Sequence, residues 1–267
     1  IAEFADFNKD GRLDIFVGAS GRDADPFPGG QNTIFMSNSD GTYTDSPELL
    51  PQVKNFTHDA TIGDVNGDGY PDIYASNVST YPGQEGKGTL PQLLLSQNGP
   101  TFESVNLEGT IFDSSIIKTI DGVGKHGNFY NSSLFVDINN DGILELVLGH
   151  SGGTTSISSK NIIVYQDGKG NFQDDTFQEL PNALWEDAVN VDIKSTDINS
   201  DGLPDLVISQ TNSDPYYDGR NLQFLIQQSD GTFNDETNDR LIGFKTYESG
   251  DSLNDQDWRE YQNTYVQ

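Results

Sequence analysis

The chain contains no cysteine and few basic residues. Without cysteine it can form neither a disulfide framework nor a thiol-based catalytic centre. Lys and Arg number 14 against 42 Asp and Glu, which gives a formal net charge of −28 at pH 7. Because nucleic acids and anionic membranes repel such a charge, neither is expected as a partner. No apolar run approaches the roughly 18 residues of a membrane span, so no membrane insertion by this segment is expected.

Helical periodicity is also nearly absent, and only the stretch around residues 182–188 could hold one helical turn. Hydrophobic residues make up 33% of the chain, less than in most globular proteins. However, 15 Phe, 11 Tyr and 2 Trp supply bulky side chains for a core. The composition therefore predicts a folded chain rather than a disordered one.

What the chain does have is one acidic nine-residue loop, present four times and beginning at residues 6, 64, 137 and 197. Oxygen side chains occupy positions 1, 3, 5 and 9, and glycine occupies position 6. Calcium binds about six to eight oxygens, and a glycine allows the chain to turn tightly around it. The predicted side-chain ligands are Asp6, Asn8, Asp10 and Asp14; Asp64, Asn66, Asp68 and Asp72; Asp137, Asn139, Asp141 and Glu145; Asp197, Asn199, Asp201 and Asp205.

Other interpretations of these loops fit less well. An EF-hand needs an acidic ligand at position 12, where this chain has Val17, Ala75, Leu148 and Ile208. Metal-free acidic turns would bring three carboxylates together without a compensating charge. A catalytic ion needs an open coordination position, whereas repetition at equivalent points favours a structural role. We therefore expect about four calcium ions, one in each repeat.

The loops lie 58, 73 and 60 residues apart, a spacing typical of repeat proteins. A short strand precedes each loop, an apolar strand follows it, and a hairpin with an Asn/Asp-Gly turn comes next. The longest period contains an inserted surface loop between residues 105 and 130. The expected strands and hairpins cover 1–5, 14–18 and 33–43; 60–63, 72–76 and 92–102; 133–136, 145–149 and 162–172; 191–196, 205–209 and 223–233.

Four antiparallel strands in about 60 residues, repeated along the chain, describe a β-propeller blade. We therefore predict an all-β fold in which residues 1–267 form a single β-propeller region. Its four blades begin near residues 1, 58, 130 and 190, and residues 258–267 resemble the first strand of a fifth. This partial blade predicts that the chain is a fragment of a larger ring.

The loop, the apolar strand and the hairpin together resemble the FG-GAP/VCBS repeat family. Its calcium-binding blades occur in integrin α-subunit propellers and in many secreted bacterial proteins. The resemblance covers almost the whole chain and implies an extracellular or cell-surface location. In the third copy Glu145 replaces the usual Asp, and its longer side chain moves the carboxylate. The resemblance also implies that backbone carbonyls at position 7 complete each site, namely those of Arg12, Tyr70, Ile143 and Leu203.

The family includes adhesins, lectins and enzyme-linked propellers, so it leaves the function open. The connections on the face opposite the loops carry aromatic rings that suit sugars or proteins, although the alternative is that the rings simply pack within their own loops. These rings are Phe27, Tyr81, Tyr216 and Tyr217. We expect adhesion or recognition of a glycan or protein, with no catalytic residues. A polysaccharide lyase propeller and a structural spacer in an adhesin or surface layer are the alternatives.

Overall fold

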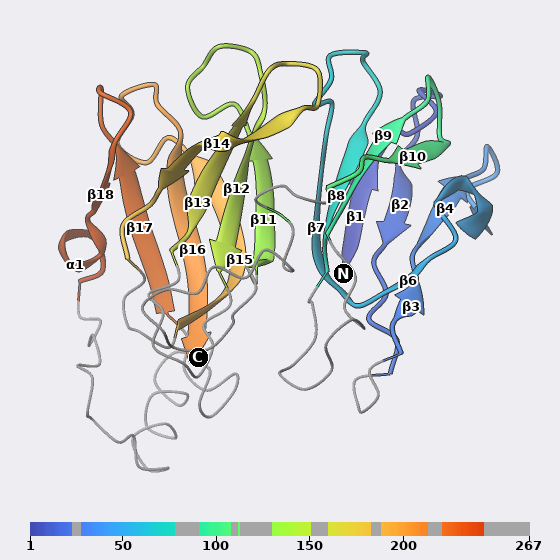
Figure 1. Ribbon diagram of the computed structural model, residues 1–267, viewed down its shortest axis with the longest axis horizontal. Coiled ribbons are helices and arrows are strands. Elements are labelled where there is room, and N and C mark those ends of the chain that lie inside the picture. The colour runs from blue at the N-terminus through green and yellow to red at the C-terminus, as the bar shows by residue number, and fades with distance from the viewer. Residues whose placement is uncertain are drawn as a thin grey trace.

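The computed structural model describes residues 1–22, 28–77, 91–107, 112, 130–150, 160–182, 188–212 and 221–242. Within these residues the chain forms four four-stranded antiparallel sheets, each made from one continuous stretch of the chain (Figure 1). The all-β fold predicted from the sequence is confirmed. Each sheet corresponds to one predicted blade.

The strands lie close to the positions expected from the loops and turns. Blade 1 contains β1 (Ala2–Ala5), β2 (Asp14–Val17), β4 (Thr33–Ser37) and β5 (Tyr43–Asp45). Blade 2 contains β7 (Thr57–Gly63), β8 (Asp72–Asn77), β9 (Gln92–Ser96) and β10 (Phe102–Ser104). Blade 3 contains β11 (Tyr130–Val136), β12 (Glu145–His150), β13 (Ile162–Gln166) and β14 (Phe172–Glu179). Blade 4 contains β15 (Ala188–Thr196), β16 (Asp205–Asn212), β17 (Asn221–Gln227) and β18 (Phe233–Asp235).

Four short elements lie outside these sheets. The strands β3 (Gly30–Gln31) and β6 (Lys54–Asn55) pair with each other. One 3-10 turn, η1 (Pro47–Leu49), and one helical turn, α1 (Thr237–Arg240), follow the last strands of blades 1 and 4. The helical turn considered near residues 182–188 is not tested, because residues 183–187 lie outside the described part. Ala188 already belongs to β15.

The first strands of blades 2, 3 and 4 are about three residues longer at their start than predicted. Each extension passes an irregularity in strand pairing, near Thr57, Tyr130 and Asn190 respectively. The extra residues are mostly polar, so their hydrophobic pattern gave no strand signal. A bulge of this kind lets a strand continue while its twist changes.

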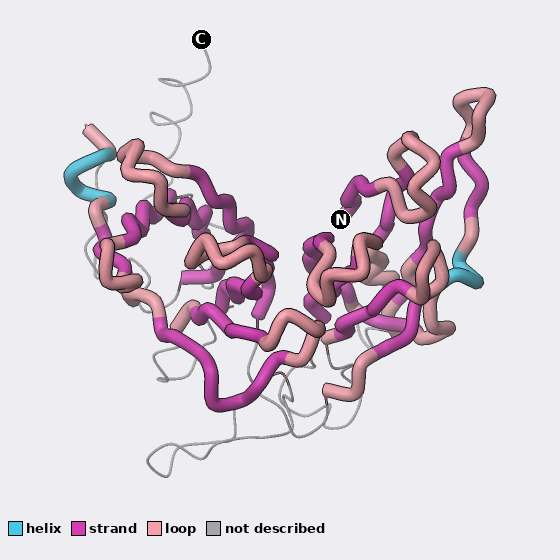
Figure 2. Tube along the Cα trace, turned by 90° about the horizontal axis from the view of Figure 1, so that it is seen from above, coloured by secondary structure: helices cyan, strands magenta, loops and turns pink. Residues whose placement is uncertain are grey.

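The blades stand side by side along an open arc (Figure 2). The first strands β1, β7, β11 and β15 contact one another in sequence order. This arrangement is that of consecutive propeller blades. Among the described residues the arc does not close into a ring. The predicted partial blade at 258–267 lies outside the described part.

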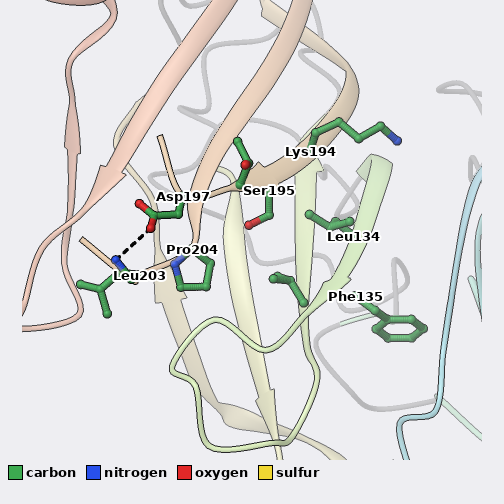
Figure 3. A pocket seen from close by; sticks show the side chains of 10 residues that line it. Leu134, Phe135, Lys194, Ser195, Asp197, Leu203 and Pro204 are labelled. Carbon is green, nitrogen blue, oxygen red and sulfur yellow. Dashed lines mark hydrogen bonds between the residues drawn. The ribbon is translucent and has the colours of Figure 1, made fainter. Parts of the chain in front are cut away.

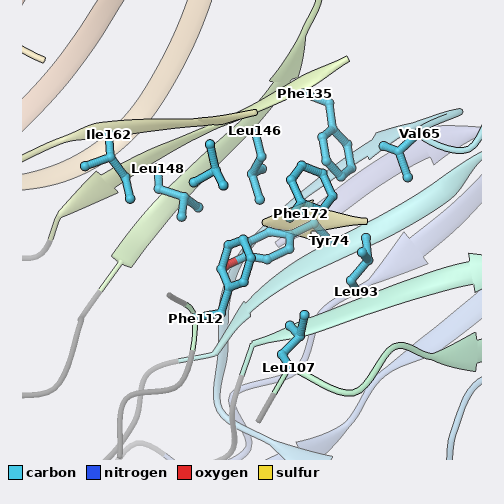
Figure 4. Packing of buried hydrophobic residues seen from close by; sticks show 11 residues of the cluster. Val65, Tyr74, Leu93, Leu107, Phe112, Phe135, Leu146, Leu148, Ile162 and Phe172 are labelled. Atoms are coloured by element: carbon cyan, nitrogen blue, oxygen red, sulfur yellow. The ribbon is translucent and has the colours of Figure 1, made fainter. Parts of the chain in front are cut away.

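The hydrophobic core consists of three clusters, one at each junction between neighbouring blades. At the junction of blades 2 and 3, Tyr74 and Leu93 pack against Phe135 and Phe172 (Figure 4). The rings of Phe135 and Phe172 are stacked with their centroids 6.4 Å apart. Each blade thus buries one apolar face against the next, so the sheets depend on one another for their stability.

Candidate metal centres: four acidic loops

The backbone of all four loops turns through the left-handed region twice. At position 6 the φ angles of Gly11, Gly69, Gly142 and Gly202 are 85°, 87°, 89° and 88°. A Cβ atom on Gly202 would meet nothing within 4 Å, so backbone conformation rather than space selects glycine there. Position 4 is also left-handed, although it holds Lys9, Gly67, Asn140 and Ser200. The sequence analysis did not anticipate this second turn, because these residue types share no conformational preference.

The side chains at positions 1, 3 and 5 fold inward onto the loop backbone. In the fourth loop the Asp201 N–H donates to Asp197 Oδ1 and to Asn199 Oδ1, both at 3.0 Å. The Gly202 N–H donates to Asp197 Oδ2 at 2.9 Å, and the Leu203 N–H donates to Asp201 Oδ1 at 2.8 Å. The first and third loops repeat this set of bonds. The predicted ligands at positions 1, 3 and 5 are therefore brought together around a common turn.

The position-9 side chain is the buried anchor of each loop. Asp14, Asp72 and Asp205 are fully buried, and Glu145 is 1% exposed. Asp205 Oδ2 accepts the Ile198 N–H and Oδ1 accepts the Gln227 N–H, both at 2.8 Å. The same carboxylate therefore joins the loop to the third strand of its blade. Asp14 and Asp72 are bonded in the equivalent way, through Ser37 and Ser96.

Two of these anchors show how crowded the carboxylates are. Burial, with a smaller contribution from the charges of Asp68 and Asp64, raises the pKa of Asp72 to about 6 despite the opposing hydrogen bonds. Burial likewise raises the pKa of Glu145 to about 7, with added repulsion from Asp141 and Asp137. Negative charge at positions 1, 5 and 9 is therefore mutually unfavourable unless a cation balances it.

The donor chemistry fits a hard divalent cation. Every predicted side-chain ligand offers oxygen, and a carboxylate oxygen that accepts one N–H keeps a second lone pair. Asp64 Oδ1 is buried without any hydrogen-bond partner, so this oxygen is available as a metal ligand in the second loop. In the first loop the Arg12 side chain pairs with Asp10 and already supplies positive charge. Over the described part of the chain, no group of three His, Cys, Asp or Glu side chains is placed to hold a metal ion, so the Asn and backbone oxygens of each loop would have to contribute as ligands.

The first loop contacts the second and the third contacts the fourth, so the loops lie at the same end of their blades. Lys9 Nζ of the first loop lies 3.9 Å from the ring centre of Tyr70 in the second. Asn140 Nδ2 of the third loop donates to the Gly202 carbonyl of the fourth at 3.1 Å. In addition, Gln166 reaches the carbonyl of Val65 in the preceding blade at 2.8 Å. The sequence analysis missed these contacts, because nothing in one repeat identifies its partner in another.

A shallow pocket of about 440 Å³ lies beside the fourth loop (Figure 3). Leu134 and Phe135 of β11, Lys194 and Ser195 of β15, and Pro204 of the loop line it. It thus lies at the loop end of the junction between blades 3 and 4. The sequence analysis placed the ligand on the opposite face, on Phe27, Tyr81, Tyr216 and Tyr217. All four rings lie outside the described residues, so that placement remains a prediction.

The four bladed sheets and their repeated loops define an all-β, propeller-like repeat protein. Residues 4–75 match the family described as FG-GAP-like repeat, from β1 to the middle of β8. The resemblance to the FG-GAP repeat family is therefore confirmed over these residues. FG-GAP repeats are typical of extracellular proteins. A comparison with curated proteins finds no match. Among the described helices, none has the length and apolar character needed to span a membrane.

Proposed function

We propose that this protein is an extracellular, calcium-stabilised β-propeller that recognises a glycan or a protein. The observation that carries this proposal is the same all-oxygen loop at the same end of four successive blades. Side chains at positions 1, 3, 5 and 9 would hold the ion, together with the position-7 carbonyls. The bound ion would supply the positive charge that the crowded carboxylates lack.

Structural stabilisation is the role that the loops favour. Each loop joins the first and second strands of its blade. In blades 1, 2 and 4 the position-9 anchor also reaches the third strand. An ion bound at this point would hold all three strands together. Since the loop end is occupied by these sites, the connections at the other end remain for recognition of a ligand. Binding loops on rigid scaffolds commonly have this division of roles.

The calcium part of the proposal predicts a large rise in thermal stability on adding calcium. Each site that binds calcium only in the folded chain adds about 2.7 kcal/mol to the free energy of unfolding at a hundredfold excess of calcium over Kd. Calorimetric titration with calcium should give about four ions per chain. A matched variant with Asn at position 5 of every loop (Asp10, Asp68, Asp141 and Asp201) should lose most of the response. Identical melting curves in calcium and in EDTA would contradict the proposal.

The recognition part needs a separate experiment. The calcium-loaded protein would be applied to a glycan array and, as immobilised bait, to extracellular matrix and cell-wall extracts. We expect saturable binding to one glycan class or one protein, without chemical change in the bound molecule. Blank results in both assays would instead favour a structural spacer. Release of unsaturated sugars from a polysaccharide panel would show a lyase.

A further inference from the structure

The second acidic loop differs from the other three at position 4. All four loops have asparagine at position 3, but in this loop alone the next residue is a glycine, Gly67. The other loops have Lys9, Asn140 and Ser200 at position 4. The Asn-Gly dipeptide occurs at one other place in the chain, Asn98–Gly99 in the hairpin of blade 2. The second loop is therefore chemically distinct at the bond between positions 3 and 4.

A glycine after an asparagine favours one reaction of the asparagine side chain. The backbone nitrogen of the glycine attacks the side-chain carbonyl carbon, and a glycine has no Cβ atom to hinder this approach. A C–N bond forms, and the amide nitrogen leaves as ammonia, taking up the proton of the attacking N–H. Water then opens the resulting succinimide ring at either of its two carbonyls. The product is aspartate or isoaspartate, and no oxidant or reductant is consumed.

The second loop also holds its position-3 side chain more weakly than the others do. Asn66 Nδ2 donates to Asp68 Oδ2 at 3.3 Å, whereas the equivalent bonds in the first, third and fourth loops measure 2.8, 3.0 and 2.8 Å. In those three loops the position-5 N–H also donates to Oδ1 of the position-1 aspartate. The equivalent atom of the second loop, Asp64 Oδ1, has no hydrogen-bond partner. The Asn66 amide is therefore freer to turn toward Gly67.

We propose that Asn66 is a site of spontaneous deamidation, and that calcium bound in the second loop slows the reaction. Gly67 is exposed, so water reaches the reacting bond. Asn66 Oδ1 accepts the Asp68 N–H at 2.9 Å and is one of the oxygens predicted to hold the ion. A bound ion would fix the side chain in this orientation, whereas the reaction requires its carbonyl carbon to move onto the Gly67 nitrogen. The protection by calcium rests on the proposed function; the reaction itself does not.

The two products would change the second loop in different ways. Aspartate adds a carboxylate beside Asp64, Asp68 and Asp72 and keeps the backbone, so the loop still offers the oxygens that calcium prefers. Isoaspartate lengthens the backbone by one methylene and shortens the side chain, which displaces the position-3 oxygen from the turn. Calorimetric titration of the separated isoaspartate form should therefore give one calcium ion fewer than the unaged chain. An unchanged number of ions would overturn this consequence.

Peptide mapping by mass spectrometry tests the reaction in the full chain. During incubation in mildly alkaline buffer with EDTA, Asn66 should deamidate at least tenfold faster than Asn199, the position-3 residue of the fourth loop. Gly67→Ser gives the second loop the residue of the fourth and should lower the Asn66 rate at least tenfold. Gly99→Ser is the matched control, which should slow deamidation of Asn98 and leave the Asn66 rate unchanged. Circular dichroism in EDTA checks that both variants are folded. An Asn66 rate no higher than that of Asn199 would overturn the proposal.

Calcium provides the second comparison. It should lower the Asn66 rate at least tenfold and leave the Asn98 rate unchanged, because Asn98 is not a predicted ligand. Equal Asn66 rates in calcium and in EDTA would overturn the protection by calcium. Melting curves then show whether the ions bind without shielding Asn66 or whether the proposed calcium sites have failed as well; the comparison in EDTA decides the reaction in either case. A similar fall of both rates in calcium would overturn a protection specific to the second loop.

Discussion

At the scale of single residues, the buried carboxylates determine how each loop is fixed. Asp205 lies with no exposed surface and accepts two backbone N–H groups from different parts of its blade. Asp201, four residues earlier, is exposed and bonds within the loop alone. Because a buried N–H that loses its acceptor is costly, the two aspartates should differ sharply in their effect on stability.

Asp205→Ala should therefore lower the free energy of unfolding by about 2–4 kcal/mol, since it leaves one buried and one half-buried N–H without an acceptor. Asp201→Ala should cost under about 1 kcal/mol, because water can replace its bonds. Urea denaturation in EDTA measures both values without any contribution from calcium. Equal losses for the two variants would contradict the anchoring role of position 9.

Asp59 on β7 provides a test that depends on pH. Burial raises its pKa to about 6, although the N–H and hydroxyl of Ser133 both donate to it. In the unfolded chain its pKa is near the ordinary value of about 3.9. The folded state thus binds the proton more tightly, and the stability from this group is lost as pH rises from about 4 to 6.

Asp59→Asn keeps an acceptor for Ser133 but cannot ionise. Relative to the wild type, this variant should gain on the order of 2–3 kcal/mol of stability between pH 4 and pH 7. Denaturant unfolding at closely spaced pH values in EDTA measures the difference. The comparison with wild type cancels the contributions of Asp72 and Glu145, whose raised pKa values act in the same direction. Parallel pH profiles would show that Asp59 ionises normally.

At the scale of the loop element, the two residues with positive φ differ in how well their residue type tolerates that backbone conformation. Gly202 has φ 88° and Ser200 has φ 64°. Gly202→Ala should destabilise the chain by about 1–2 kcal/mol, because a Cβ atom disfavours this backbone region. Ser200→Gly should stabilise it by up to about 1 kcal/mol, for the reverse reason. Thermal unfolding of both variants checks the pair, and a change of the same sign in each would contradict the conformational argument.

The elements show what sequence patterns could and could not predict. The second strands and the hairpins were placed to within a few residues, because apolar alternation and Asn/Asp-Gly turns mark them directly. The polar starts of the first strands were missed, and so was the pairing of β3 with β6. These features depend on pairing partners that lie about 20 or more residues away in the sequence. For example, Asn161 Oδ1 accepts both the His150 N–H and an amide proton of Asn190, 29 residues away, which no local pattern indicates.

The candidate site was predicted in the same uneven way. Residue types and spacing identified the four loops and the positions that converge in them. They did not reveal that position 9 is buried against the third strand, since Ser37, Ser96 and Gln227 have no shared signature. The aromatic residues proposed for ligand recognition lie outside the described residues.

At the scale of the whole molecule, stability resides in the junctions between blades. Phe172 is 9% exposed within one junction, whereas Tyr43, at the same repeat position of blade 1, is 48% exposed. In dilute solution Phe172→Ala should cost about 3–5 kcal/mol. Tyr43→Ala should cost about 1 kcal/mol or less, because its ring contributes little buried area. Chemical denaturation compares the two variants, and similar costs would contradict the argument that burial in a junction sets the loss.

Each of the four bladed sheets is formed from one uninterrupted stretch of the chain, with no strand exchanged between them. Duplication or deletion of a segment from one first strand to the next would therefore add or remove a complete sheet. Every backbone ladder in the remaining sheets would stay intact. A duplicated unit would need only to keep the two apolar surfaces that pack against the neighbouring blades. Boundaries for such recombination therefore lie near residues 56, 129 and 187.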